Sequence, residues 1–137
     1  MAHPTVGCKH AGISDRLPAS GPDLWRPVDN YLMGALLPPD LTLTGALERS
    51  TAPCLPEIAV APNQGKLLQL IARMIGARRI LVVGTLGGYS PIWLARTLPT
   101  DGRLTTLEVD PKHAQVARGN VDQRPGRGDL TDVHVST

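Results

Sequence analysis

One segment, ILVVGTLGGYSPIWLAR at residues 80–96, constrains the fold of this chain more than any other. It opens with the β-branched apolar run at residues 80–83, which is typical of a strand buried on both faces, as in parallel sheets. A glycine-rich turn follows at once. Ser90 and Pro91 come next, and these residue types are favoured at a helix N-cap and at the first helical position. The segment therefore predicts a strand, a tight turn and a helix in immediate succession.

Helix and strand patterns alternate on both sides of this segment. Apolar residues at helical spacing predict a helix over 62–75, and Gly76 is its stop signal. Further strands are predicted at 104–109 and from 132 to 136, and between them Asp110 can cap a helix that runs to about residue 120. The order αβαβα(β) predicts the α/β class, with a doubly wound parallel sheet.

The 137-residue length predicts one compact unit. Ahead of this unit, an irregular tail and then a helical segment are expected. Pro27 fits only the first turn of a helix, so the regular part of the first helix in that segment is expected from Arg26. Asp40 then caps a second helix through about Ser50. The expected divisions are a flexible tail at 1–20, a helical arm at 21–56 and an α/β unit at 57–137.

Composition excludes several classes of protein. The formal net charge is only +2 and aromatic residues make up 3% of the chain, so neither a basic surface nor rows of stacking side chains favour nucleic-acid binding. No apolar run is long enough to span a bilayer, and the first residues lack the apolar segment of a signal peptide. We therefore expect a cytoplasmic protein with no membrane or nucleic-acid partner.

The glycine-rich turn is well placed to bind a ligand. Its glycines let the backbone approach closely, and ligands of open parallel sheets bind at the carboxyl ends of the strands. Glu108 ends the second strand, close to the ~20-residue offset at which an acid accepts hydrogen bonds from ribose hydroxyls. Leu86 breaks the dinucleotide pattern G-x-G-x-x-G that would start at Gly84, and the turn has no Lys or Arg to hold a polyphosphate. A nucleoside without phosphates, such as S-adenosylmethionine (SAM), fits better.

These residues also carry a family resemblance. VGTLGGYSPIWLAR and TLEVDPKHAQVAR resemble the cation-dependent O-methyltransferases of the caffeoyl-CoA and catechol type, which are class I SAM-dependent enzymes. PNQGKLLQLIARMIGARRIL is similar to the helix before the first strand of that family, and the resemblance covers residues 23 to about 120. It implies a Rossmann-like fold and methyl transfer from SAM to a hydroxyl of a small, catechol-like acceptor, which a divalent cation such as Mg²⁺ and a base activate.

The resemblance also implies a set of cofactor contacts. In the family, the matching positions contact SAM through a backbone ahead of the first helix, along its methionine portion, near its amino-acid end and at its ribose. These positions are, in that order, Val60, Gly84 with Thr85, Ser90 and Glu108.

The sequence departs from the family in two ways. Val82 stands where the family has an acid that interacts with the amino-acid end of the cofactor. The family sheet has seven strands, and its metal-binding Asp and Asn residues and catalytic Lys lie in a second half, beyond Thr137. We therefore assign no catalytic residue and no metal ligand, and we expect a chain that is truncated relative to the family, with only about three strands. The histidines show no ligand spacing, and His113 is expected to point outward.

A missing fourth strand has a physical consequence. Residues 80–83 would form an open apolar edge, so we expect the chain to be marginally stable, or to form a homodimer or aggregate through this edge. The main hypothesis is a SAM-dependent O-methyltransferase chain with a small-molecule acceptor. The alternative is a non-catalytic remnant that at most binds a nucleoside or pairs with another subunit. A fragment of a dinucleotide-dependent oxidoreductase is a third hypothesis, which the glycine spacing disfavours.

Overall fold

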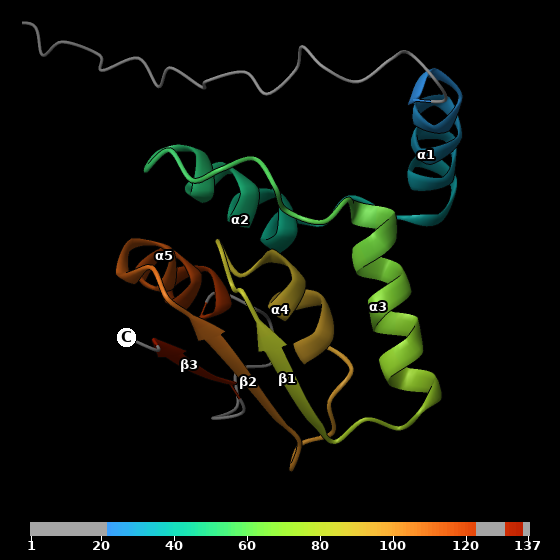
Figure 1. Ribbon diagram of the computed structural model, residues 1–137. Coiled ribbons are helices and arrows are strands. Elements are labelled where there is room, and N and C mark those ends of the chain that lie inside the picture. Colours follow the sequence, from blue (N-terminus) through green and yellow to red (C-terminus); the bar gives the residue numbers. More distant parts are fainter. Residues whose placement is uncertain (1–21, 123–130, 136–137) are drawn as a thin grey trace, which may run out of the picture.

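The structure is a computed structural model that describes residues 22–122 and 131–135 (Figure 1). Five helices and three strands lie in these ranges, and the predicted tail at 1–20 lies outside them. In chain order the elements are α1 (Pro22–Leu36), α2 (Leu41–Thr51), α3 (Pro62–Met74), β1 (Arg79–Val83), α4 (Tyr89–Ala95), β2 (Arg103–Glu108), α5 (Pro111–Asp122) and β3 (Thr131–Val135).

The three strands form one parallel sheet in the order β1-β2-β3. Ile80 lies opposite Leu104, and Leu104 lies opposite Thr131. One helix connects each pair of neighbouring strands, α4 between β1 and β2 and α5 between β2 and β3 (Figure 1). This arrangement confirms the predicted α/β class and the partial, three-stranded parallel sheet.

Strand β1 lies at an edge of this sheet, which confirms the predicted open edge within the described residues. The prediction that this strand is buried on both faces is wrong. Leu81 is 63% exposed and Val83 77% exposed, whereas Ile80 and Val82, which alternate with them, are partly buried. The apolar run reflects what the strand can bury, and the described part of the chain covers only one of its faces.

Two helix starts differ from the sequence prediction. Helix α1 begins at Pro22 and keeps Pro27 in its interior, so it starts earlier than Arg26 and leaves unmade one hydrogen bond that a proline nitrogen cannot donate. Helix α4 begins at Tyr89, and its N-cap is Gly88 rather than Ser90. Gly88 has a φ of 81°, a left-handed conformation that glycine adopts without strain, so the chain enters the helix before it reaches the Ser-Pro pair.

The other cap predictions are confirmed. Oδ1 of Asp40 accepts a hydrogen bond from the Leu43 N–H at the start of α2 (3.0 Å). Oδ1 of Asp110 accepts one from the Lys112 N–H at the start of α5 (2.8 Å). Gly76 follows α3 with a φ of 62°, as expected for a residue that stops a helix.

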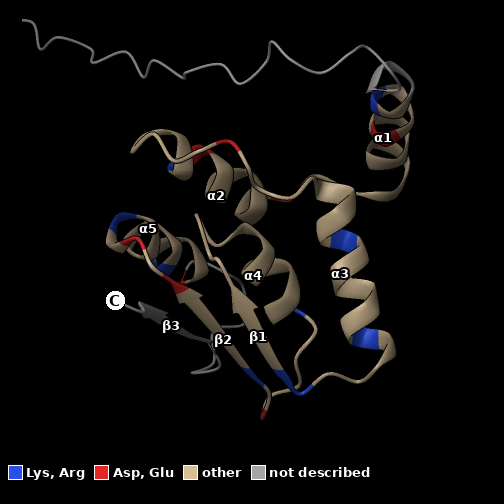
Figure 2. Cartoon of the chain, viewed as in Figure 1, with Lys and Arg blue, Asp and Glu red and all other residues tan. Residues whose placement is uncertain are grey.

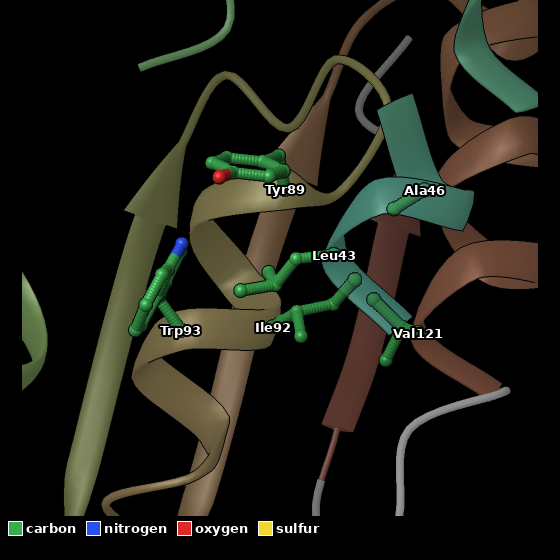
Figure 3. Packing of buried hydrophobic residues seen from close by; sticks show 6 residues of the cluster. All are labelled: Leu43, Ala46, Tyr89, Ile92, Trp93 and Val121. Carbon is green, nitrogen blue, oxygen red and sulfur yellow. The ribbon is translucent and has the colours of Figure 1, made fainter. Parts of the chain in front are cut away.

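The hydrophobic core joins three helices above the sheet (Figure 3). The buried members of this core are Leu43 and Ala46 from α2, Tyr89, Ile92 and Trp93 from α4, and Val121 from α5. Burial of a large apolar side chain such as Leu43 or Ile92 contributes roughly 1.5–3 kcal/mol to folding relative to an exposed one. Helix α2 of the predicted arm therefore shares one core with the α/β unit.

Close helix packing explains one glycine of α3. A Cβ atom at Gly65 would overlap the indole ring of Trp93, so α3 can lie against α4 only because this residue has no side chain. Within the described ranges, no helix has both the length and the apolar character needed to cross a bilayer.

Candidate functional site

A cavity of about 660 Å³ lies at the carboxyl ends of β1 and β2. The end of α2, the connector after it, the glycine turn and the start of α5 line this cavity, and its volume is in the ~300–1,000 Å³ range of small-molecule sites. The structure brings together all the residues implied as cofactor contacts, because each of them lines this one cavity: Val60, Gly84, Thr85, Ser90 and Glu108.

Glu108 fastens the turn after β1 to the end of β2. Its Oε2 atom accepts hydrogen bonds from the backbone N–H groups of Thr85 (2.9 Å) and Leu86 (2.8 Å). Its Oε1 atom accepts one from the Asp110 N–H (3.0 Å). The side chain is only 7% exposed, and such a buried carboxylate is tolerated because it is hydrogen-bonded.

The same contacts decide the ionisation of Glu108. Burial by itself raises the pKa of this carboxyl group, but the N–H groups of Asp110, Leu86 and Thr85 donate to the ionised form and bring the net pKa below its ordinary value. Glu108 is therefore a carboxylate at neutral pH. In Figure 2 the carboxyl end of β2 is coloured red for an acidic residue, and the opposite ends of β1 and β2 are coloured blue for basic residues.

The glycine turn has a fixed conformation. Gly84, with a φ of 83°, donates its N–H to the Leu107 carbonyl (2.9 Å), and the Thr85 hydroxyl donates to the same carbonyl (3.1 Å). The Thr85 hydroxyl also contacts that of Thr106, which is fully buried. The Gly88 N–H donates to the Thr85 carbonyl (2.9 Å) and closes the turn. Hydrogen bonds within the chain therefore hold both ends of the turn.

Ser90 and Val60 reach the cavity from different elements. Ser90 lies in the first turn of α4, and since Gly88 takes the N-cap position, its hydroxyl does not cap the helix. Val60 precedes α3 and packs against the hydrophobic core. At the N-terminus of α3, the residue after Val60 is capped: Oε1 of Gln64 accepts a hydrogen bond from the Ala61 N–H (3.0 Å).

His113 was expected to point outward, and this prediction is wrong. Its side chain is 20% exposed and lines the cavity, with Nδ1 3.8 Å from Oε1 of Glu108 and Nε2 3.8 Å from Oδ2 of Asp110. The helical spacing contains the missed signal. His113, Ala117 and Asn120 follow one another at steps of four and three residues, and the last two are buried, so His113 belongs to the inner face of α5.

The sequence of residues 40–136 matches the profile of a family described as O-methyltransferase. This match covers more than half of the chain. The chain belongs to the O-methyltransferase family. Membership confirms the family resemblance that the sequence carries in its glycine turn and second strand.

Curated relatives of this O-methyltransferase chain agree with the match. A catechol O-methyltransferase of Mycobacterium tuberculosis is 52% identical over 108 residues, which are 79% of this chain and 49% of the relative. A catechol O-methyltransferase of Niastella koreensis is 49% identical over 100 residues, which are 73% of this chain and 45% of the relative. The chain therefore spans about half the length of the curated relatives it matches.

Solved structures of O-methyltransferases share the fold. The O-methyltransferase from Bacillus cereus in complex with SAH has a TM-score of 0.78 and 47% identity, over 82% of this chain and 51% of that one. TomG from Streptomyces achromogenes, in complex with SAM, has a TM-score of 0.76 and 44% identity, over 82% of this chain and 50% of that one. The described sheet and its helices thus correspond to part of the O-methyltransferase fold.

Metal ligands are a separate question for this O-methyltransferase chain. Among the residues that the structure describes, no group of three or more His, Cys, Asp or Glu side chains lies close enough together to hold a metal ion. Glu108, Asp110 and His113 lie near one another, but the carboxylate of Glu108 is already bonded to backbone N–H groups.

Proposed function

We propose that this chain binds SAM in the cavity at the carboxyl end of the sheet, as the cofactor-binding part of an enzyme that methylates a hydroxyl group of a small, catechol-like acceptor. The observation that carries the proposal is the meeting of an ionised, buried Glu108 with the glycine turn at one wall of the cavity. Similar O-methyltransferases were solved with SAH or SAM, and similar curated proteins are named catechol O-methyltransferase, which supports both halves of the proposal.

The residues present fit the cofactor. A carboxylate offers about four acceptor positions, and three backbone N–H groups occupy three of those on Glu108, so acceptor capacity remains for a ribose hydroxyl. A Cβ atom built at Gly84 would meet no atom within 4 Å, so the space beside the turn is open to a ligand. Gly84 has a φ of 83°, a conformation that residues with side chains rarely adopt. The backbone therefore favours glycine at this position, and glycine leaves the space unfilled.

We propose a separate role for each of the residues that line the cofactor site. When bound, SAM would supply the methyl group from its positively charged sulfur: the new O–CH₃ bond would replace the S–CH₃ bond, SAM would leave as SAH and the acceptor hydroxyl would lose its proton. Glu108 accepts hydrogen bonds from the ribose, Gly84 and Thr85 line the methionine portion, and Ser90 lies near the amino-acid end. Val60 contributes its backbone. Because the partly buried Val82 cannot replace the acid of the family, the amino-acid end lacks one contact.

The described residues do not fit the divalent cation that the family resemblance implies, because they include no cluster of three or more His, Cys, Asp or Glu side chains that could hold it. Among them we propose neither a ligand for Mg²⁺ nor a catalytic residue.

Isothermal titration of the 137-residue chain with SAM, its demethylated product SAH, and NAD tests the cofactor assignment. Binding of SAM and SAH without binding of NAD is the expected result. Binding of NAD alone would favour a dinucleotide-dependent enzyme. Absence of heat with all three would contradict the proposal and favour a remnant without cofactor.

We also propose that a second copy of this chain covers the open edge of β1. Antiparallel pairing of two β1 strands about a two-fold axis centred on Leu81 would place Arg79 opposite Val83, so no like charges would face each other. Such pairing would satisfy the backbone N–H and C=O groups that the open edge leaves unpaired, and it would place the exposed Leu81 side chain beside that of the partner strand.

A further inference from the structure

Asn120 on α5 joins three parts of the chain that are far apart in sequence. The side chain is 1% exposed. Its Nδ2 atom donates to the carbonyl of Gly87 in the glycine turn (2.7 Å) and to the carbonyl of Ala46 in α2 (3.1 Å). Its Oδ1 atom accepts from Nε of Arg49, also in α2 (2.6 Å). A single buried amide therefore bonds α5, α2 and the turn together.

The chemistry of the partners fixes the orientation of this amide. The two carbonyls can only accept hydrogen bonds and the guanidinium of Arg49 can only donate them. A rotated amide would set Oδ1 against the two carbonyls and Nδ2 against the guanidinium. An aspartate has no N–H for the Gly87 carbonyl, and a leucine of similar size can make none of the bonds.

The second half of the turn is held on two sides. A Cβ atom at Gly87 would overlap the Ser50 hydroxyl of α2, and one at Gly88 would lie 3.3 Å from the backbone of Ala117 in α5. Ser50 Oγ itself donates to the Ala46 carbonyl (2.7 Å), the same carbonyl that accepts from Asn120. The turn therefore lies between α2 and α5 at this point, and Asn120 supplies the polar bond between all three.

We propose that Asn120 is a positioning residue of the cofactor site. It holds the Gly87 carbonyl, so that the N–H groups of the turn face Glu108 and the Ser90 side chain faces the cavity. Asn120 does not line the cavity and acts only through the turn, which Glu108 holds from the other side. This inference rests on the proposed SAM-binding function.

Two measurements on the variants Asn120→Asp and Asn120→Leu test it. The first is the affinity for SAH by titration, where we expect a loss of about 10-fold, the usual effect of one lost hydrogen bond. The second is amide hydrogen exchange of Thr85, Leu86 and Gly88 in the cofactor-free chain. In the variants, the exchange rates of these three amides should rise above their wild-type values, and they should rise by more than the exchange rates of the β2 amides.

A matched variant separates positioning from a general loss of stability. Leu104→Val also removes buried contacts, since Leu104 is fully buried, but it lies toward the amino end of β2, away from the turn. It should lower global stability while it leaves both SAH affinity and the relative exchange of the turn unchanged. If either Asn120 variant fails to fold, Arg49→Met removes only the bond to Oδ1 and should loosen the turn to a smaller extent.

The outcomes separate the positioning role of Asn120 from the proposed binding of SAM. Asn120 variants with wild-type affinity and wild-type exchange of the turn, or variants that behave like Leu104→Val in both measurements, would overturn the inference. If the unmodified chain does not bind SAH, the proposed function fails, but exchange in the cofactor-free chain still shows whether Asn120 orders the turn.

Discussion

The Thr85 backbone N–H donates to the Glu108 carboxylate over 2.9 Å, and this bond links the turn after β1 to the end of β2. The acid that we propose as the partner of the cofactor ribose thus also organises the turn that lines the cavity. Removal of the Glu108 charge should therefore affect folding and cofactor binding together.

Glu108→Gln should weaken both stability and SAH binding. The amide NH₂ of glutamine would face backbone N–H donors, and the ionised acceptor for the ribose would be lost. We expect a loss of about 1–3 kcal/mol of unfolding free energy and about 10-fold in SAH affinity, as measured by urea unfolding and titration. Glu48→Gln is the matched control, because Glu48 is an exposed residue of α2 that does not line the cavity. A Glu108→Gln variant that matches this control in both measurements would show that the carboxylate has no special role.

The pH dependence of stability should report the same carboxylate. Its pKa is lower in the folded chain than in the unfolded chain, so its contribution is complete above the ordinary value of ~4.3 and is lost as the pH falls through the folded value. Unfolding free energies measured from pH 7 to pH 3 should therefore converge for the wild type and Glu108→Gln at the acid end. Curves that stay parallel over the whole range would contradict the assigned pKa direction.

The open β1 edge should control self-association. The wild-type chain is expected to form dimers or larger species in analytical ultracentrifugation, and Leu81→Lys should shift it toward monomer because a charge blunts an exposed edge. Leu41→Lys makes the same change at a residue of α2 that is 89% exposed and lies away from β1, and it should leave association unchanged. A wild-type chain that is monomeric with a cooperative melt would rule out pairing through this edge.

Two glycine-to-alanine changes should have opposite effects on stability. Gly65→Ala would force a methyl group into the Trp93 indole and should cost about 1–3 kcal/mol, the usual range for overpacking. Gly34→Ala, in α1, meets nothing within 4 Å and should stabilise its helix by up to ~1 kcal/mol. Urea unfolding of both variants checks the pair. Equal effects would mean that α3 and α4 do not pack as closely as described.

Local chemistry explains why much of the fold could be predicted from the sequence. The caps at Asp40 and Asp110 depend on a side chain and an N–H two or three residues later, so the sequence contains both partners. The Ser-Pro pair is a strong local signal, and it predicts a start of α4 that is two residues too late. Gly88 offers an earlier start that only its backbone conformation reveals.

Properties that depend on distant partners could not be read in the same way. The continuous apolar run of β1 does not tell which of its faces is covered, and Leu81 and Val83 are exposed because exposure is set by neighbouring elements. The glycine turn and Glu108 were predicted to lie close together, since parallel strands bring their carboxyl ends to one edge. The bonds of Asn120 to Gly87 and Arg49 depend on how two helices pack, for which the sequence has no local signal.

A crystal structure of the 137-residue chain grown with SAH tests the central claim most directly. We expect the ligand to lie in the cavity, with a ribose hydroxyl oxygen at a hydrogen-bond distance of about 2.5–3.0 Å from the Glu108 carboxylate and its amino-acid portion along the turn at Gly84 and Thr85. A ligand that lies elsewhere on the chain, or in this cavity with its ribose away from Glu108, would contradict it.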